Sequence, residues 1–433
     1  IACTRELLAD HGKEIDRERT AVILGNAMGG ELHYETALRI TAPQVVRFLQ
    51  QTQAYGALPP DQQQQLGAQL VATMGEQLPP VTEDSMPGEL ANVVAGRLAN
   101  LFNLRGPNYI TDAACASAMA AMSAAVEGLN KGDFDTAISG GIDRNNGATS
   151  FIKFCAIGAL SATGTRPFDA GADGFVMGEG ASLFLLKRLA DAERDGDRIY
   201  AVIRGMGGAS DGKGKGITAP NPVGQRLAVE RAWADAGISP EECTMVEAHG
   251  TSTRVGDVVE VEALGEAFSD ADLPPHRIAL GSVKSNIGHL KAGAGSAGVL
   301  KTALAIHHAK MPPSLNFETP NPNVDWSVSP FTVNTELRDW TVPAGRVRTA
   351  GVSSFGFGVT KSHMVLEEYQ PGRIVAPDAP RSYAASVAPA ASAAPASAAA
   401  PEPKAPLRGA AVLGAADEAG LAMVFTSMRH FRH

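Results

Sequence analysis

A short apolar run passes into a long alanine-rich segment in the stretch Tyr109-Ile-Thr-Asp-Ala-Ala-Cys115-Ala-Ser-Ala-Met-Ala-Ala-Met-Ser-Ala-Ala-Val-Glu127. This pattern predicts a strand that ends at Thr111 or Asp112, a tight turn, and a helix over about residues 115–129. A cysteine on the first turn of a helix lies near the positive end of the helix dipole, which favours its thiolate. Cys115 is therefore a candidate nucleophile, and the alternative is a small buried hydrophobe in a closely packed helix.

The chain has 433 residues, a hydrophobic content of 44% and a net charge of −9. It is long enough for one large domain or two ordinary ones. Acidic and basic residues are interspersed without a basic stripe, which argues against nucleic acid or an anionic membrane as a partner. No uninterrupted apolar stretch reaches the length of a membrane span.

The four cysteines, Cys3, Cys115, Cys155 and Cys243, are far apart and show no metal-ligand spacing. We therefore expect no metal site and no disulfide framework. This use of cysteine fits the reducing cytoplasm, which is the expected location.

Predicted strands alternate with predicted helices along most of the chain, which favours an α/β fold with helices packed between sheets. Three junctions between a strand and a loop follow one another in the second half. Residues 244–248 run into His249, residues 278–283 run into a loop and a long helix to about residue 308, and residues 349–354 lead to a last strand at 364–368.

Three glycine-rich patterns match known signatures but lack the context of each. Residues 208–212 fit G-x-S-x-G, yet the residues that follow cannot start the required helix. Residues 207–213 fit a phosphate-binding loop, but Gly214 stands where Ser or Thr is needed. Residues 293–298 fit G-x-G-x-x-G but lie inside a predicted helix. Close packing of helices and backbone explains all three patterns better.

Four residues form a more specific constellation, because Cys115, His249, Lys284 and His289 each lie near the end of a predicted strand. A single histidine in such a place is more often a structural cap. Together, and surrounded by small residues, the four fit a thiol nucleophile with imidazole partners. The start of a helix at His289 should lower its pKa, so that the neutral ring donates a hydrogen bond to an oxyanion. The charge of Lys284 would steady the site and bind the carboxylate of an acidic substrate.

At these positions the chain resembles the β-ketoacyl synthases, the condensing enzymes of fatty acid and polyketide synthesis. Asp112-Ala-Ala-Cys115-Ala-Ser117 resembles the nucleophile motif of that family. Val246-Glu-Ala-His249-Gly-Thr-Ser-Thr and Lys284-Ser-Asn-Ile-Gly-His289 resemble its two histidine motifs. Further matches are Arg166-Pro-Phe-Asp169, Gly174-Phe-Val-Met-Gly-Glu-Gly180 and Gly351-Val-Ser-Ser-Phe-Gly-Phe357-Gly, and the resemblance runs from about residue 21 to residue 368.

The resemblance implies a thiolase-like fold, with two related halves in five α-β-α-β-α layers, in a protein that is usually a homodimer. Cys115 would accept an acyl group from an acyl carrier protein, whose phosphopantetheine arm carries the substrates, so that the domain itself binds no cofactor. A malonyl unit would then lose CO₂ beside His249 and His289, and its carbanion would attack the acyl-cysteine. Two histidines favour an elongating synthase, and the other domains of a megasynthase would be further partners.

The family also implies roles for several other residues. The backbone N–H groups of Cys115 and Phe357 would form an oxyanion hole, with Phe357 as a gate on its loop. The substrate-binding residues would be Thr251, Thr253, Asn286 and Phe355. Two departures from the family pattern stand beside the gate: Val359 and Lys361 replace the usual Gly and Asn.

We expect three segments in the chain. Residues 1–368 resemble a β-ketoacyl synthase domain that is N-terminally incomplete, since the opening strand and loops of the family have no counterpart before Ile1. Residues 369–406 are rich in Ala, Pro and Ser and predict a linker. Residues 407–433 would begin a following linker or acyltransferase-associated segment, as in type I polyketide or polyunsaturated fatty acid synthases.

Two other functions remain open at this stage. One is a non-condensing synthase-like domain that only binds or gates acyl carrier protein. The other is a cysteine hydrolase or transferase that releases its acyl group to water.

Overall fold

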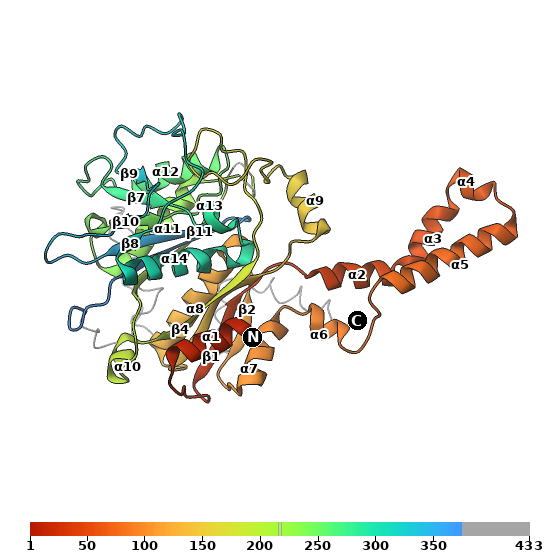
Figure 1. Ribbon diagram of the computed structural model, residues 1–433, viewed down its shortest axis with the longest axis horizontal. Helices are drawn as coiled ribbons and strands as arrows, with labels where there is room; N and C mark the ends of the chain where they lie inside the picture. The colour runs from red at the N-terminus through yellow and green to blue at the C-terminus, as the bar shows by residue number, and fades with distance from the viewer. Residues whose placement is uncertain (215, 218, 375–433) are drawn as a thin grey trace, which may run out of the picture. The chain divides into compact units, whose positions relative to one another are not determined.

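The computed structural model describes residues 1–374 with the exception of residues 215 and 218. The first sheet has the strand order β2-β1-β3-β4, and the second has the order β5-β12-β11-β6-β7-β9 (Figure 1). The strands of the first sheet are β1 (Thr20–Gly25), β2 (Asn108–Thr111), β3 (Thr136–Asp143) and β4 (Gly180–Lys187). Those of the second are β5 (Val202–Ser210), β6 (Met245–Glu247), β7 (Ile278–Gly281), β9 (Phe331–Val333), β11 (Thr349–Phe355) and β12 (Thr360–Glu367). A short antiparallel pair joins β8 (Lys310–Met311) to β10 (Arg338–Asp339).

The helices follow the predicted alternation with the strands. They are α1 (Ala2–His11), α2 (Glu31–Ile40), α3 (Ala42–Gln50), α4 (Gln53–Gly56), α5 (Pro60–Gln77), α6 (Ser85–Glu89), α7 (Asn92–Phe102), α8 (Ser117–Lys131), α9 (Ala148–Ala156), α10 (Leu189–Arg194), α11 (Pro222–Ala236), α12 (Gly256–Ala267), α13 (Lys284–Ile287) and α14 (Ala294–His308). The 3₁₀ turns are η1 (Ala114–Ala116), η2 (Pro240–Glu242) and η3 (Lys291–Gly293). Residues 293–298 therefore span η3 and the start of α14, as predicted, and no dinucleotide-binding turn forms there.

The alternation of side chains along β1 shows why helices cover both faces of the first sheet. Val22 and Leu24 pack with residues of α1 and α7, whereas Ala21 and Ile23 pack with residues of α8. Successive side chains of a strand point to opposite faces, so a strand that is buried along its whole length needs a cover on each side.

The second sheet is covered in the same way. One face packs against α11 and α12, through residues such as Trp233 and Leu264. The other face packs against α8 and α14, where Met119, Met122 and Ile306 fill the space between the two sheets. The layers are therefore α1 and α7, the first sheet, α8 and α14, the second sheet, and α11 and α12. This arrangement confirms the predicted five-layered α/β fold (Figure 1).

The two halves of the chain repeat one topology. In the first half, β2, β1 and β3 are parallel and β4 pairs antiparallel to β3. In the second half, β7, β6 and β11 are parallel and β12 pairs antiparallel to β11. Each half thus supplies one buried helix, α8 or α14, to the central layer.

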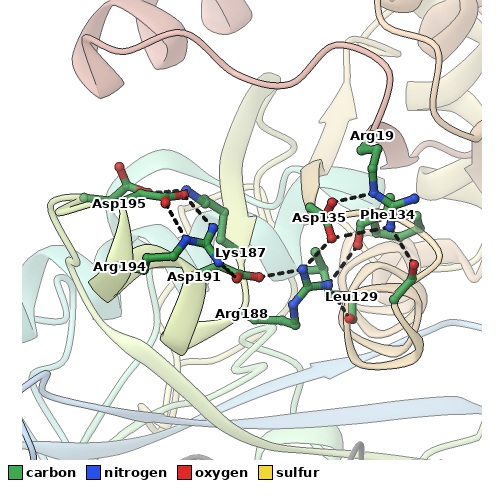
Figure 2. Close-up of polar contacts among 11 residues, drawn as sticks. Arg19, Leu129, Phe134, Asp135, Lys187, Arg188, Asp191, Arg194 and Asp195 are labelled. Carbon is green, nitrogen blue, oxygen red and sulfur yellow. Dashed lines mark hydrogen bonds and ion pairs between the residues drawn. The ribbon is translucent and has the colours of Figure 1, made fainter.

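A network of charged residues joins the edges of the first half (Figure 2). Asp135, just before β3, pairs with Arg19 before β1 and with Arg188 before α10. The same two guanidinium groups donate to backbone carbonyls, Arg19 to that of Gly132 at 2.6 Å and Arg188 to that of Leu129 at 2.9 Å. Asp135 therefore ties together three segments that are distant in the sequence.

No helix among the described residues is long and apolar enough to cross a bilayer. Within the same residues, no group of three or more His, Cys, Asp or Glu side chains is arranged to hold a metal ion. The four cysteines are free thiols. The predicted linker from residue 375 onward, and the predicted segment at 407–433, lie outside the described residues.

Candidate active site

Cys115 lies in a braced turn between β2 and α8. The turn is the 3₁₀ segment η1, so α8 begins at Ser117, two residues later than the predicted start. Ala114 has φ 50°, a conformation that non-glycine residues rarely adopt. The Asp112 carboxylate accepts the Ala114 N–H at 3.0 Å, and the Ser117 hydroxyl donates to the Ala114 carbonyl at 2.6 Å. These short polar side chains hold the turn that presents the thiol.

The prediction of an acidic Cys115 thiol is wrong in direction. Burial raises the pKa of this thiol, which outweighs the lowering by hydrogen bonding from the Phe357 backbone N–H and by the positive charge of Lys284. Removing a thiolate from water costs more than one helix start returns, because the dipole contributes only about 0.3–1 kcal/mol in exposed settings.

His249 follows β6 and is held by its own backbone. Its N–H donates to Glu260 Oε1 at 2.7 Å, and the Gly250 N–H donates to Glu260 Oε2 at 2.7 Å. Lys284 Nζ donates to the His249 carbonyl. The ring nitrogen Nδ1 accepts the Phe355 N–H at 3.3 Å, so in a neutral ring the proton stands on Nε2.

His289 is held in the same state by different groups. Its side chain is buried, and Nδ1 accepts the Lys291 N–H at 2.8 Å. The Phe175 ring packs against the imidazole at 4.6 Å between centroids. Nε2 therefore carries the proton of the neutral ring here as well.

Both imidazoles are kept neutral. Burial is the main cause that lowers the pKa of His249 and of His289 well below the ordinary value, and the charge of Lys284 adds to it. The predicted lowering at His289 is confirmed, although its cause is burial rather than the helix dipole. The two ring centroids lie 5.7 Å apart with the planes at 86°. Two such donors near one thiol suit the stabilisation of a developing oxyanion.

Residues 355–361, here called the gate loop, join β11 to β12 beside Cys115. A Cβ on Gly356 would lie 2.3 Å from the Ala113 carbonyl oxygen, so only glycine fits against the nucleophile turn. Ser354, just before the loop, donates to the Cys115 carbonyl at 2.8 Å. The side chain of Phe357 is 51% exposed, whereas its N–H bonds toward the Cys115 sulfur. The loop thus turns its backbone to the thiol and an aromatic ring to solvent.

Two family descriptions match this chain. "Beta-ketoacyl synthase, N-terminal domain" matches residues 1–192, and "Beta-ketoacyl synthase, C-terminal domain" matches residues 200–318. The chain belongs to the β-ketoacyl synthase family. Ketosynthases of this family are acyl-transferring condensing enzymes, and the predicted resemblance is confirmed.

The relatives of this ketosynthase are polyketide and fatty acid synthases. It is 42% identical to a subunit of the phenolphthiocerol/phthiocerol polyketide synthase of Mycobacterium bovis over 68% of this chain and 16% of the relative. It is 43% identical to a subunit of the polyunsaturated fatty acid synthase of a Thraustochytrium species over 66% of this chain and 10% of the relative. The chain therefore spans less than a fifth of the length of these two relatives.

A solved structure supports the fold of the ketosynthase. The ketosynthase from module 6 of the bacillaene synthase of Bacillus subtilis 168 superposes with a TM-score of 0.68 at 35% identity. The match covers 83% of this chain and 57% of that chain.

The structure brings most of the predicted site residues of the ketosynthase together, but not all of them. Lys284 is buried and faces the His249 backbone, and Phe355 packs its ring 5.5 Å from that of His249. Thr251 and Thr253 lie in the loop before α12, with their hydroxyls 3.3 Å apart. Asn286 is exposed and donates to the Pro313 carbonyl at 3.3 Å. Their substrate-binding roles, and that of Lys284 toward a carboxylate, stay predictions.

Sequence reasoning missed Glu260, Ser354 and Phe175 as parts of the ketosynthase site. Glu260 offers a signal, because a carboxylate on an otherwise apolar face of α12 needs a buried partner. Its pKa is raised to about 7, first of all by burial. Ser354 and Phe175 carry no comparable signal, since their contacts depend on tertiary packing.

Proposed function

We propose that this ketosynthase catalyses the decarboxylative Claisen condensation of a Cys115-bound acyl group with malonyl-acyl carrier protein, in polyketide or polyunsaturated fatty acid synthesis. The observation that supports it most is the pair of neutral imidazoles, 5.7 Å apart, that both keep their Nε2 protons beside the thiol. A hydrolase would instead need a base that activates water, and two rings held as donors do not supply one.

In the first step the Cys115 thiolate attacks the carbonyl carbon of an acyl thioester on the phosphopantetheine arm of the carrier. The N–H groups of Cys115 and Phe357 stabilise the tetrahedral oxyanion, and the phosphopantetheine thiol leaves. Both groups are hydrogen-bond donors toward the sulfur in the resting state. The acyl group then stays on Cys115 as a thioester.

In the second step malonyl thioester loses CO₂, and the electrons of the broken C–C bond form an enolate. The Nε2–H groups of His249 and His289 stabilise the enolate oxygen. The α-carbon attacks the acyl-cysteine, and the Cys115 thiolate leaves as the new C–C bond forms. Because neither histidine needs to change its charge, the low pKa of both rings fits this role.

The proposed partners follow from the chemistry and from the exposed surface. Acyl carrier protein brings both substrates, so no separately bound cofactor is required. A second copy of the chain would cover β2, which is an edge strand with Asn108 and Tyr109 exposed. The other domains of a megasynthase are further partners, and free thiols at all four cysteines fit a cytoplasmic location.

We retain the proposed domain bounds. Residues 1–368 would form the ketosynthase domain, and the last strand among the described residues, β12, ends at Glu367. The bounds of the linker at 369–406 and of the segment at 407–433 rest on composition alone.

The function is tested by separating the two steps. We expect His249→Ala and His289→Ala to acquire an acyl group at Cys115 but to release CO₂ from malonyl carrier protein about 10²–10³ times more slowly, the usual cost of one lost oxyanion donor. Lys284→Ala should resemble them, because it releases the His249 backbone. The measurements are intact-protein mass for acylation and radiolabelled CO₂ for decarboxylation.

Cys115→Ala is the matched control, since it should lose acylation completely. A histidine variant that decarboxylates at the parent rate has been given the wrong role. If the parent protein acylates but never forms a β-ketoacyl product, the domain is a non-condensing gate.

A further inference from the structure

A buried ion pair lies at the end of the gate loop, apart from the catalytic residues. Lys361 Nζ lies 2.8 Å from Asp211 Oδ2, and the two side chains are 5% and 4% exposed. Lys361 lies on β12, whereas Asp211 directly follows β5, the neighbouring strand of the sheet. A buried pair of this kind must be matched closely, because each charge depends on the other for its compensation.

The same two residues bind the backbone of the gate loop. The Asp211 N–H donates to the Val359 carbonyl at 3.1 Å. Lys361 Nζ approaches the Gly356 carbonyl at 3.5 Å, and the Gly356 N–H donates to the Thr360 carbonyl at 2.7 Å. The loop is therefore fixed at both sides of Phe357.

The backbone at the tip of the loop is strained. Val359 has φ 76°, a region that a β-branched residue enters only when its surroundings hold it there. The strain is located between the two contacts of Asp211, one to the Val359 carbonyl and one to the Lys361 ammonium. Without these contacts the loop has a physical reason to relax.

The charges near the pair leave Asp211 dependent on Lys361. Asp211 Oδ1 is buried and has no hydrogen-bond partner among the described residues. Lys361 also lies close enough to His249 for its positive charge to lower the pKa of that ring. The pair therefore stands behind the reacting groups.

We propose that Asp211 and Lys361 are positioning residues, which hold the strained gate loop so that the Phe357 N–H points at the oxyanion formed on Cys115-bound substrate. This inference rests on the proposed function, because it assigns the pair to the acyl-transfer step. Neither residue touches the substrate, and both act through the loop backbone. Lys361 thereby gives a role to a residue that departs from the usual family pattern.

The test compares two reactions of the same thiol. Acylation by an N-acetylcysteamine thioester forms an oxyanion, whereas alkylation by iodoacetamide does not. Both need the thiolate, so the ratio of the acylation and alkylation rate constants at one pH removes any change in thiolate fraction. We expect Lys361→Met and Asp211→Asn to lower this ratio roughly 10- to 100-fold, in line with the cost of a misplaced group in an active site.

The double variant Asp211→Asn/Lys361→Met keeps the size of both side chains and leaves no uncompensated buried charge. It serves as the folded form of the test where a single variant is too unstable. We expect its ratio to be lowered as well, because the neutral pair no longer fixes the loop. Lys187→Met is the matched control, since it breaks a pair with Asp197 that has no contact with the gate loop, and its ratio should equal that of the parent.

The outcomes distinguish the inference from the function beneath it. A folded double variant with the parent ratio overturns the positioning role. An equal fall of the ratio in Lys187→Met would also overturn it, because the effect would then be general destabilisation. If the parent protein itself shows no acylation of Cys115, the proposed function has failed rather than the inference.

Discussion

Burial decides the protonation of each reactive residue in this ketosynthase. The pKa of Cys115 is raised by burial, and the pKa values of His249 and His289 are lowered by it. Both shifts favour the uncharged form, as expected where water is excluded. The resting site is therefore a neutral thiol beside two neutral rings, and charge develops only when substrate reacts.

The reaction of Cys115 with iodoacetamide should show this shift directly. Because the raised pKa delays the loss of the thiol proton, the alkylation rate should still rise with pH where that of a small peptide thiol has levelled. The measurement is the rate constant of Cys115 labelling across alkaline pH, with peptide mapping to resolve the four cysteines. A profile that levels below that of the peptide thiol would contradict the expected direction.

At this scale the sequence identifies residues better than it assigns their states. Cys115, His249 and His289 were found from their motifs, and the structure brings the two rings together. The sign of the Cys115 shift was missed, because depth of burial is a tertiary property. The partner of Lys361 was missed for a similar reason, since Asp211 lies 150 positions away in the chain, at the end of a neighbouring strand.

Among the elements, those with local end signals were predicted best. The helix α11 covers Pro222–Ala236, where the Asn221 side chain accepts the Val223 N–H and Gly237 takes a left-handed conformation. Both signals can be read from the sequence. The strands β8, β9 and β10 have two or three residues each and were not predicted. Such short strands exist only because a partner strand is in place, and periodicity cannot detect them.

The charged network around Asp135 connects elements in the same non-local way. Hydrogen bonds from Arg19 and Arg188 lower the pKa of Asp135 from 3.8 to about 2. A depressed carboxyl pKa stabilises the fold above its unfolded value, and the contribution is lost as the pH falls through the folded one. The side chain is 38% exposed, so solvent screening limits the gain to about 1 kcal/mol.

We therefore expect Asp135→Asn to lower the free energy of unfolding by about 1 kcal/mol at neutral pH. The difference from the parent should shrink as the pH falls from about 4 toward 2, the interval between the two pKa values. Urea unfolding at several pH values measures it. Glu18→Gln is the control, because its pair with Arg105 is more exposed, at 64% and 60%. A difference that stays constant with pH would argue for a packing defect instead.

At the scale of the whole molecule, the site is built from two related halves. Cys115 comes from the first half, between β2 and α8, and His289 from the second, between β7 and α14. The same positive φ recurs at Ala114 and Lys291, with values of 50° and 49°, just before each central helix. One repeated junction thus presents a nucleophile in one half and a hydrogen-bond donor in the other. The motifs predicted both residues, but this correspondence of junctions became visible only in the structure.

The proposed homodimer makes a prediction about the edge of the first sheet. β2 pairs with β1 on one side only, because it ends the order β2-β1-β3-β4. The carbonyls of Pro107 and Thr111 accept N–H groups from the β1 side. Backbone groups alternate in direction along a strand, so the N–H of Asn108 points away from β1. Such an unpaired edge suits the same strand of a second copy across a two-fold axis.

We expect Asn108→Pro to weaken the dimer, because proline removes the outward N–H without disturbing the pairing of β2 with β1. Two-fold symmetry removes two hydrogen bonds per dimer, each worth about 0.5–1.5 kcal/mol, so the dissociation constant should rise roughly 10- to 100-fold. Asn108→Ala keeps the N–H and should dimerise like the parent. Sedimentation equilibrium over a range of concentrations measures both variants. If Asn108→Pro and Asn108→Ala dimerise equally well, the two copies do not meet through β2.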